Sequence, residues 1–142
     1  MTESALIDRT KRFALRVMNV VRALPKKVEG RVIADQLMRS DTSVRANYRA
    51  ACKARSHAEF ISKLGTVEEE EADETASWLE LLIDGGVISQ KRLQPLLLEA
   101  RELVAIFAAS RKTAGRNARS QIANRKLQIP DSARSKRRRS KR

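Results

Sequence analysis

The chain has 142 residues, the length of a single domain, and 42% of them are hydrophobic but only 4% are aromatic. Its core must therefore be built from leucine, valine, isoleucine and alanine. The net charge of +13 favours a polyanionic or acidic partner. The single cysteine, Cys52, excludes an intramolecular disulfide and a cysteine-based zinc cluster.

The beginning of the chain is polar and charged, so no secretory signal peptide is expected. No apolar run approaches the roughly 20 residues that are needed to cross a bilayer. We therefore expect a cytoplasmic protein that has no membrane partner.

The positive charge is distributed unevenly. Residues 1–56 carry a net charge of +8, and residues 57–112 carry a net charge of −5. Residues 113–142 hold eleven basic residues and one acidic residue. The body of the protein is thus nearly balanced, and the C-terminal segment holds most of the excess.

Apolar residues at spacings of three and four predict a first pair of amphipathic helices. The first helix spans about residues 6–24 and ends at Pro25, because proline disfavours a helical conformation in the residue before it. The second helix starts between residues 28 and 31, where Gly30 leaves its first turn uncertain, and ends near residue 55.

The same spacing predicts two more helices. Ser56 and Glu59 form an S-x-x-E capping box, which starts the third helix at about residue 57. This helix ends at about residue 83, before Gly85-Gly86, and the fourth spans about residues 89–112 with Gly115 as its cap. Short connections make consecutive helices antiparallel neighbours. The sequence therefore predicts an all-α, up-and-down four-helix bundle.

The segment after this bundle shows no sustained apolar period. A short helix over about residues 121–129 is marginal, and the final RSKRRRSKR is typical of a solvated, disordered basic segment. We therefore assign residues 1–113 to the bundle and residues 114–142 to a basic, disordered tail.

The second and third helices share a seam whose two rows both advance in alternating steps of four and three. The first row is Ile33, Leu37, Ser40, Val44, Asn47, Ala51 and Ala54. The second row is Phe60, Leu64, Val67, Glu71, Glu74, Trp78 and Leu81.

Folding the chain at about residue 56 places Arg39 level with Glu74, Ser43 with Glu70 and Asn47 with Thr66. A carboxylate that leaves water costs several kcal/mol unless it is paired. We therefore predict an Arg39–Glu74 ion pair within a polar layer that fixes the register of the two helices. A carboxylate site is the alternative interpretation of this layer, whose members are Arg39, Ser40, Asn47, Glu71 and Glu74.

The second helix carries Arg45, Arg49 and Lys53 at a spacing of four, so they share one face. Such a face is either solvated or in contact with phosphates, and the pattern alone leaves both open. Tyr48 lies beside this face, where it either stacks on a base or enters a subunit interface. With the tail, the stripe predicts a nucleic-acid surface made of Arg45, Arg49, Lys53, Arg116, Arg119, Arg125, Lys126, Arg137, Arg138 and Arg139.

The chain offers no catalytic motif that we recognise. Di-metal helical bundles use Glu-x-x-His pairs, and no such pair occurs here. The only histidine, His57, is separated from Glu74 by about 17 residues of helix, or roughly 25 Å. Neither a glycine-rich phosphate loop nor a nucleophile elbow is present. We expect no enzymatic activity, no cofactor and no metal.

Several short pieces of the chain, taken in order, resemble one known family. The resemblance covers roughly residues 13–113 and includes the segment 102–113. The remaining pieces are Gln36-Leu37, Arg39-Ser40, Ser43-Val44, Ala46-Asn47, Glu59-Phe60, Lys63-Leu64, Glu71-Ala72, Glu74-Thr75 and Trp78-Leu79. The chain is similar to the bacterial four-helix-bundle proteins of the ribosomal-RNA intervening-sequence family, whose relatives include accessory proteins of diversity-generating retroelements.

The resemblance implies an up-and-down bundle that assembles as a ring-like homopentamer and binds RNA or DNA without catalysis. It also implies a reverse transcriptase or another RNA-handling protein as a partner. From the residues alone, the thin core and the surplus of apolar helix faces predict a homo-oligomer of unspecified number. The alternative function is a protein–protein interaction scaffold whose basic tail binds acidic partners.

Overall fold

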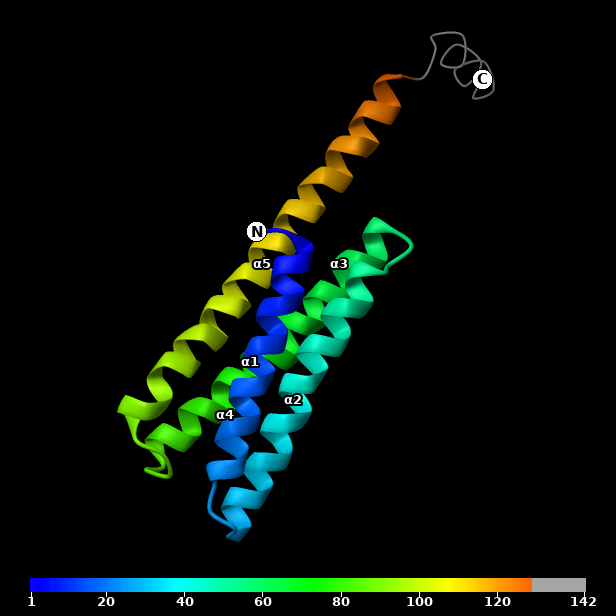
Figure 1. Cartoon of the computed structure of the whole chain (residues 1–142). Helices are drawn as coiled ribbons and strands as arrows, with labels where there is room; N and C mark the ends of the chain where they lie inside the picture. Colours follow the sequence, from blue (N-terminus) through cyan, green and yellow to red (C-terminus); the bar gives the residue numbers. More distant parts are fainter. Residues whose placement is uncertain (129–142) are drawn as a thin grey trace, which may run out of the picture.

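The computed structural model describes residues 1–128, with the exception of the side chains of Glu68 and Glu69. These residues form helices and no strand, which confirms the predicted all-α class (Figure 1). The elements are α1 (Glu3–Ala23), α2 (Val28–Cys52), α3 (His57–Gly65), the π-helix η1 (Thr66–Ala72), α4 (Asp73–Asp84) and α5 (Gln90–Leu127).

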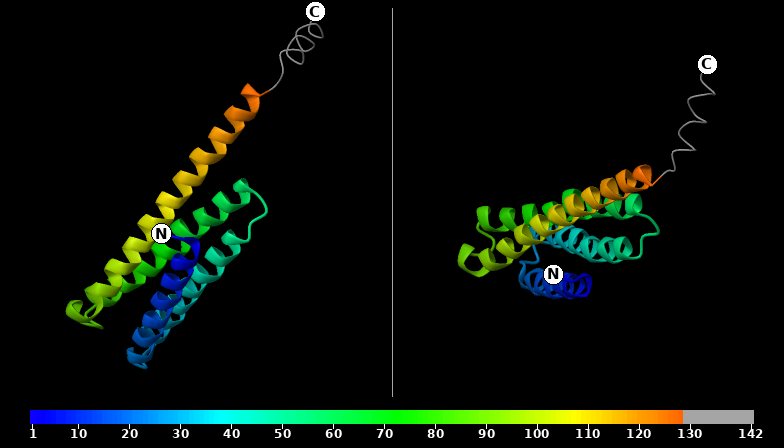
Figure 2. Two further views of the ribbon diagram at one scale, coloured as in Figure 1. Left: turned by 45° about the horizontal axis from the view of Figure 1, so that its top comes forward. Right: turned by 90° about the horizontal axis from the view of Figure 1, so that it is seen from above.

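The described helices make four rods, because α3, η1 and α4 follow one another without a break. Each rod is antiparallel to the one before it, as short turns require (Figure 1). Figure 2 shows α1 at the edge of the bundle beside α2, and α5 extending past the other helices. One end of the bundle carries the start of α1 and the α2–α3 turn, and the opposite end carries the other two turns.

The turn between α1 and α2 brings two backbone segments into close contact. A Cβ atom on Gly30 would lie 2.0 Å from the carbonyl oxygen of Pro25, which is less than any real contact allows. Glycine is therefore needed in the first turn of α2 for a packing reason. Gly30 is also the reason why the sequence does not fix where this helix starts, because glycine is a weak helix former.

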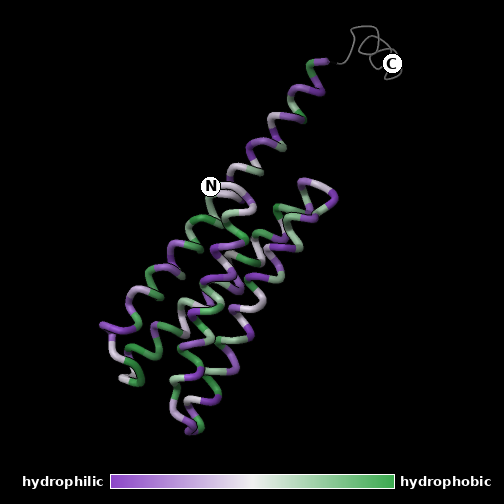
Figure 3. Tube along the Cα trace, in the orientation of Figure 1, coloured by the Kyte–Doolittle hydropathy of each residue, from purple (hydrophilic) through white to green (hydrophobic). Residues whose placement is uncertain are grey.

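The core lies between the rods and is filled mainly by aliphatic side chains. Hydrophobic and hydrophilic residues alternate along each helix (Figure 3). Phe107 of α5 is fully buried, and its ring centroid lies 5.4 Å from that of Tyr48 on α2. Tyr48 is itself only 5% exposed. This aromatic pair anchors α5 to α2 near the end of the bundle that carries the α2–α3 turn.

The π-helix changes which residues of the third rod reach the core. Leu64 and Val67 are buried at their predicted positions, but the next buried side chain among those described is that of Ala72, five positions on. A π-helix has a wider turn than an α-helix, with hydrogen bonds five residues apart. From the last residue of the π-helix onward, the buried residues of this rod are Ala72, Thr75, Ala76, Leu79 and Leu82.

The predicted seam of the third helix is therefore wrong beyond Val67. One extra residue rotates everything that follows by about 100° around the rod. Glu71, Glu74 and Trp78 consequently lie half-buried at its edge, and Leu81 is exposed.

The fourth rod is longer than the sequence predicts. Helix α5 continues through Gly115 to Leu127, so the expected cap at Gly115 is wrong and residues 114–127 are helical. Gly115 has no positive φ, and a glycine in a helix costs about 1 kcal/mol relative to alanine without ending it. This part of α5 projects past the other helices and is mostly hydrophilic (Figure 3).

No helix within residues 1–128 is both long enough and apolar enough to span a membrane.

Candidate nucleic-acid interface

The predicted basic stripe lies on the C-terminal half of α2. Arg49 and Lys53 are exposed, and Lys53 caps the helix, where a cation suits the negative end of the helix dipole. Arg45 departs from the prediction because it is half-buried. Its Nε is buried without a hydrogen-bond partner among the described residues. The exposed part of the stripe is thus shorter than the sequence indicates.

The α2–α3 turn follows this stripe and is fixed by a reciprocal cap. Ser56 Oγ accepts a hydrogen bond from the backbone N–H of Glu59 at 3.1 Å. The Glu59 carboxylate in turn accepts one from the backbone N–H of Arg55, also at 3.1 Å. These two bonds satisfy donors that a helix start otherwise leaves free. They hold Arg55 and His57 in exposed positions at the end of the bundle.

The projecting part of α5 carries a second set of cations. Arg116, Arg119, Arg125 and Lys126 are all exposed, and α5 contains no acidic residue after Glu102. Spacings of three and seven place Arg116, Arg119 and Lys126 on one side of the helix, with Arg125 turned about 100° from Lys126. The predicted positions Arg137, Arg138 and Arg139 lie outside the described residues.

The α2 stripe and the projecting part of α5 lie at the same end of the molecule (Figure 1). A cavity of about 780 Å³ separates them. Its lining includes the apolar side chains of Leu6, Phe60 and Ile106 and the thiol of Cys52, together with polar residues such as Glu3, while Arg55 stands at its rim. Burial, as the largest cause, raises the pKa of the Cys52 thiol. The sequence does not predict this cavity. The cavity forms where the rods of α1, α2 and α3 end beside α5, which continues further.

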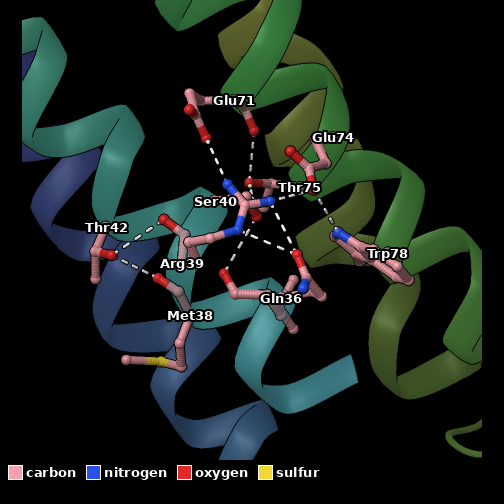
Figure 4. A network of polar contacts seen from close by, with 10 residues as sticks. Gln36, Met38, Arg39, Ser40, Thr42, Glu71, Glu74, Thr75 and Trp78 are labelled. Atoms are coloured by element: carbon pink, nitrogen blue, oxygen red, sulfur yellow. Dashed lines mark hydrogen bonds and ion pairs between the residues drawn. The ribbon is translucent and has the colours of Figure 1, made fainter. Parts of the chain in front are cut away.

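Arg39 and Glu74 form the ion pair that the register predicts, at the edge between α2 and α4 (Figure 4). Arg39 Nη2 also donates to Gln36 Oε1 at 3.0 Å, and Trp78 Nε1 donates to Glu74 Oε1 at 3.1 Å. The hydrogen bond from Arg39 lowers the pKa of Glu74. The Arg39 side chain is 48% exposed and that of Glu74 32%, so the pair lies at the surface rather than in the seam.

The rest of the predicted polar layer divides between core and edge. Ser40 is fully buried, and its Oγ lies 2.9 Å from Thr75 Oγ1. Glu71 is half-buried, and burial raises its pKa despite the Arg39 guanidinium at 3.6 Å. Asn47 is half-buried. Thr75 is the core partner that the predicted row omits, because the π-helix brings it inward.

The structure contains a second ion-pair cluster that the sequence analysis missed. Arg9 on α1 donates from Nε to Glu99 Oε1 at 2.7 Å and from Nη2 to Glu99 Oε2 at 3.0 Å. Its Nη2 also lies 2.9 Å from Glu102 Oε1. The side chains of Arg9 and Glu99 are only 18% and 19% exposed. The hydrogen bond from Arg9 lowers the pKa of Glu99.

Asp41 is a buried acid that the sequence analysis also missed. It is 1% exposed, and its Oδ2 has no hydrogen-bond partner among the described residues. Burial raises its pKa from 3.8 to about 7. The sequence does contain a signal, since Leu37, Asp41, Val44 and Tyr48 follow the same four-three-four spacing as the predicted row. None of the described His, Cys, Asp and Glu residues gather in groups of three that could hold a metal.

The comparisons with known proteins agree with this geometry. The family model for 23S rRNA-intervening sequence proteins matches residues 2–109. The chain belongs to the 23S rRNA-intervening sequence protein family. A crystal structure of a family relative from Bacteroides thetaiotaomicron, described as a protein of unknown function from the S23 ribosomal protein family, is 33% identical with a TM-score of 0.72. The match covers 79% of this chain and 99% of that one. No curated protein matches the chain.

Membership of the 23S rRNA-intervening sequence protein family accounts for the bundle but not for the whole chain. The family match ends at Ala109, within the part of α5 that packs against the other rods. The projecting part of α5 and its cations therefore lie beyond the region that defines the family.

Proposed function

We propose that this protein is a non-catalytic, homo-oligomeric nucleic-acid-binding protein that contacts the phosphate backbone. The observation that carries the proposal is the pair of basic surfaces at one end of the molecule, one on α2 and one on the projecting part of α5. The four exposed cations of α5 from Arg116 to Lys126 have no acidic residue on the same stretch of helix. Such a one-sign surface attracts polyanions.

Phosphate contacts rather than base contacts are expected to dominate the binding. Exposed aromatic side chains are the usual platforms for bases. Tyr48, the aromatic residue nearest the stripe, is buried against Phe107 and so presents no ring face to a base. Binding should therefore show weak sequence selectivity and a steep dependence on salt.

An exposed apolar strip supports the oligomeric part of the proposal. Val28 is 71% exposed and Val32 52%, one turn apart on α2. Val32 lies seven residues before Arg39, and Leu81, 49% exposed, lies seven residues after Glu74. Because Arg39 and Glu74 meet, Val32 and Leu81 lie at about the same level on neighbouring rods. Contiguous exposed apolar surface is typical of subunit interfaces.

The family resemblance adds two finer points to this proposal. One is a ring of five copies, in which the basic surfaces would repeat and concentrate positive potential. The other is a role as accessory factor to a reverse transcriptase or another RNA-handling protein. Light scattering after size exclusion tests the first point, since a monomer mass at micromolar concentration would contradict it. Neighbouring genes that encode a reverse transcriptase would support the second.

Salt titration of binding to duplex DNA and to single-stranded RNA tests the central proposal. If about five phosphates are neutralised per binding unit, log K should fall with log salt at a slope of about −4.5 for duplex DNA. Deletion of residues 114–142 should weaken binding and flatten this slope. Reversal of Arg45, Arg49 and Lys53 to glutamate in the shortened protein should weaken what remains.

A matched control separates this surface from net charge. Lys26, Lys27 and Arg31 are exposed at the opposite end of the bundle, and their reversal changes the net charge by the same amount. This control should bind more tightly than the α2 variant. Equal losses would mean that binding follows net charge alone, and the interaction-scaffold function would then be favoured.

A further inference from the structure

The cavity at the open end of the bundle continues into an uncharged row on α5. Ser110, Ala114 and Asn117 line the cavity. In steps of four and three the same row continues through Gln121, Asn124 and Gln128 to the end of the helix. All six positions are uncharged on a stretch of helix that is otherwise rich in cations. This spacing is the one by which a helix packs along a partner helix.

The cations of α5 lie outside this row: Arg116 and Arg125 lie on its two flanks, and Arg119 and Lys126 lie on the opposite side of the helix. One residue of an α-helix corresponds to about 100° of rotation, so Arg116 lies to one side of Asn117. Arg125 lies to one side of Asn124 in the same way, on the opposite flank of the row. Arg55 stands across the cavity from α5, on the α2–α3 turn. The row is therefore flanked by positive charge, and the cavity is lined by both Arg55 and the acidic Glu3.

The projecting part of α5 lacks the packing that normally stabilises a helix. Isolated helices shorter than about 12–15 residues are marginal in water, and the segment 114–127 has a length within this range. Gly115 lowers the helix propensity further, and neighbouring cations repel one another. A partner that packs on the row and neutralises these cations would stabilise the segment.

We propose that the cavity and the uncharged row of α5 form a docking groove for an acidic amphipathic helix of a partner protein. Apolar side chains at one end of that helix occupy the cavity, against Leu6, Phe60 and Ile106. The rest of the helix lies along the row, with its carboxylates toward Arg116 and Arg125. This is the helix-in-groove mode of peptide recognition, completed by charge complementarity.

Two other occupants fit the groove less well. A nucleic acid satisfies the cations but leaves the aliphatic side chains of the cavity, Leu6 and Ile106, without an apolar partner. A second α5 would bring a row bordered by the same cations, and like charges in contact repel. An acidic helix satisfies both the apolar cavity and the positive border.

The test uses the full chain and three labelled synthetic peptides of about twenty residues, the length that spans the row at 1.5 Å per residue. The first has leucines spaced by three and four on one face and glutamates elsewhere. The second has the same composition with the leucines scattered around the helix, and the third has lysine in place of glutamate. The first peptide should bind about tenfold more tightly than the second, because only it can place leucines in the cavity.

Two protein variants locate the peptide. Asn117→Trp puts a large side chain at the cavity and should weaken the first peptide about tenfold. Ala123→Trp puts the same side chain at an exposed position away from the row and should leave binding unchanged. Circular dichroism of both variants checks that the helices remain intact. If both variants bind the first peptide as the natural protein does, the groove is not the docking site.

Cys52 provides a direct readout of the cavity, because it is the only cysteine and lines this cavity. The first peptide should slow its reaction with a thiol reagent, whereas a single-stranded RNA of about twenty nucleotides that binds the basic stripe should not. Protection of Cys52 by RNA and not by the peptide would overturn the proposal in favour of nucleic acid. Equal binding of the first and second peptides would mean that charge alone determines the affinity, and the docking groove would be contradicted. RNA binding without peptide binding would leave the proposed function intact and remove only this inference.

Discussion

Ser40 and Asp41 are neighbours on α2, and both are buried, but their surroundings differ. Ser40 Oγ lies 2.9 Å from Thr75 Oγ1 and 3.3 Å from the carbonyl oxygen of Leu37. Asp41 points about 100° away from Ser40, and its Oδ2 has no hydrogen-bond partner among the described residues. A hydroxyl is cheap to bury once it is hydrogen-bonded, whereas an unpartnered carboxylate is not. The contact between α2 and α4 is thus satisfied, and Asp41 is a buried acid that the fold tolerates.

Replacement of Asp41 by asparagine should give the largest effect. With a folded pKa of about 7, Asp41 binds its proton more tightly in the folded than in the unfolded chain, where 3.8 is the usual value. Its stabilising contribution is complete below about pH 4 and is lost as the pH rises through 7. Between about pH 5.5 and pH 8, the natural protein should lose about 2 kcal/mol of unfolding free energy from this group. Asp41→Asn should remove that loss.

Denaturant unfolding at several pH values measures this effect. Asp35, an exposed acid on the same helix, offers a matched control. Asp35→Asn should unfold with the same pH dependence as the natural protein. A natural protein whose stability is flat over this range would show that Asp41 has a partner in solution and that the contrast with Ser40 does not hold.

Arg9 shows what a partly buried charge costs when it does have partners. Its bidentate contact with Glu99 joins the first helix to the last, which otherwise pack only lightly against each other. Arg9→Met should lower the unfolding free energy by about 1–3 kcal/mol, since it removes charged hydrogen bonds and leaves Glu99 unpaired. Because the pKa of Glu99 is lowered, this contribution should be lost as the pH falls below about 4.5.

A double-mutant cycle with Glu99→Gln isolates this interaction from other effects of the substitution. Arg101 and Glu80 form a more exposed pair on α5 and α4, with side chains 50% and 51% exposed, and provide the comparison cycle. The Arg9 cycle should give clearly the larger coupling energy. Equal coupling in the two cycles would mean that partial burial adds nothing here.

The sequence predicted one of these ion pairs and not the other, for a physical reason. Arg39 and Glu74 belong to rods that a short turn joins, so counting from the turn gives their level. Arg9 and Glu99 belong to the first and last rods, which no turn connects directly. Their level depends on how the whole bundle closes, and no local pattern contains that information.

The third rod shows how a local irregularity defeats a periodic pattern. The row of predicted seam residues assumes a constant helical turn, but η1 inserts a wider one after Gly65. The predicted height of Glu74 along the rod axis is still correct, because one extra residue shifts that height by only about 1.5 Å. The predicted orientation of Glu74 around the rod axis is wrong, because one extra residue also rotates the following residues by about 100°. The sequence thus predicts the position of a residue along the helix axis better than its direction around that axis.

The candidate interface was predictable to a similar extent. Arg49 and Lys53 are exposed as the charge pattern suggests, since nothing in the core can neutralise them. The half-burial of Arg45 follows from packing between rods, which spacing alone does not give. The continuation of α5 past Gly115 was missed because the apolar period ends where the bundle ends. The uncharged row on α5 is recognised only from the structure, because it continues from a cavity that the sequence does not predict.

The hydroxyl of Thr75 should matter less than the charges of Arg9 and Glu99. Thr75→Val keeps the shape of the side chain but removes the bond to Ser40 and the 2.8 Å bond to the carbonyl oxygen of Glu71. The unfolding free energy should fall by about 1 kcal/mol, the usual net worth of a buried neutral hydrogen bond. Thr75→Ser keeps the hydroxyl and serves as the control, although it loses a buried methyl group. If Thr75→Val were neutral, the hydrogen bond between Thr75 and Ser40 would contribute nothing measurable to the contact between α2 and α4.

Arg39 and Glu74 should give the smallest effect in the isolated chain. Their side chains remain half-exposed, and water and salt screen an ion pair of this kind. Arg39→Met and Glu74→Gln should each shift the denaturation midpoint slightly, and less at high salt than at low salt. A loss as large as that of Arg9→Met would contradict this. It would also indicate that another copy covers the edge, since Val32 and Leu81 lie close by on the same two rods. Repeating the measurement over a range of protein concentrations decides between these cases, because a loss caused by assembly must grow with concentration.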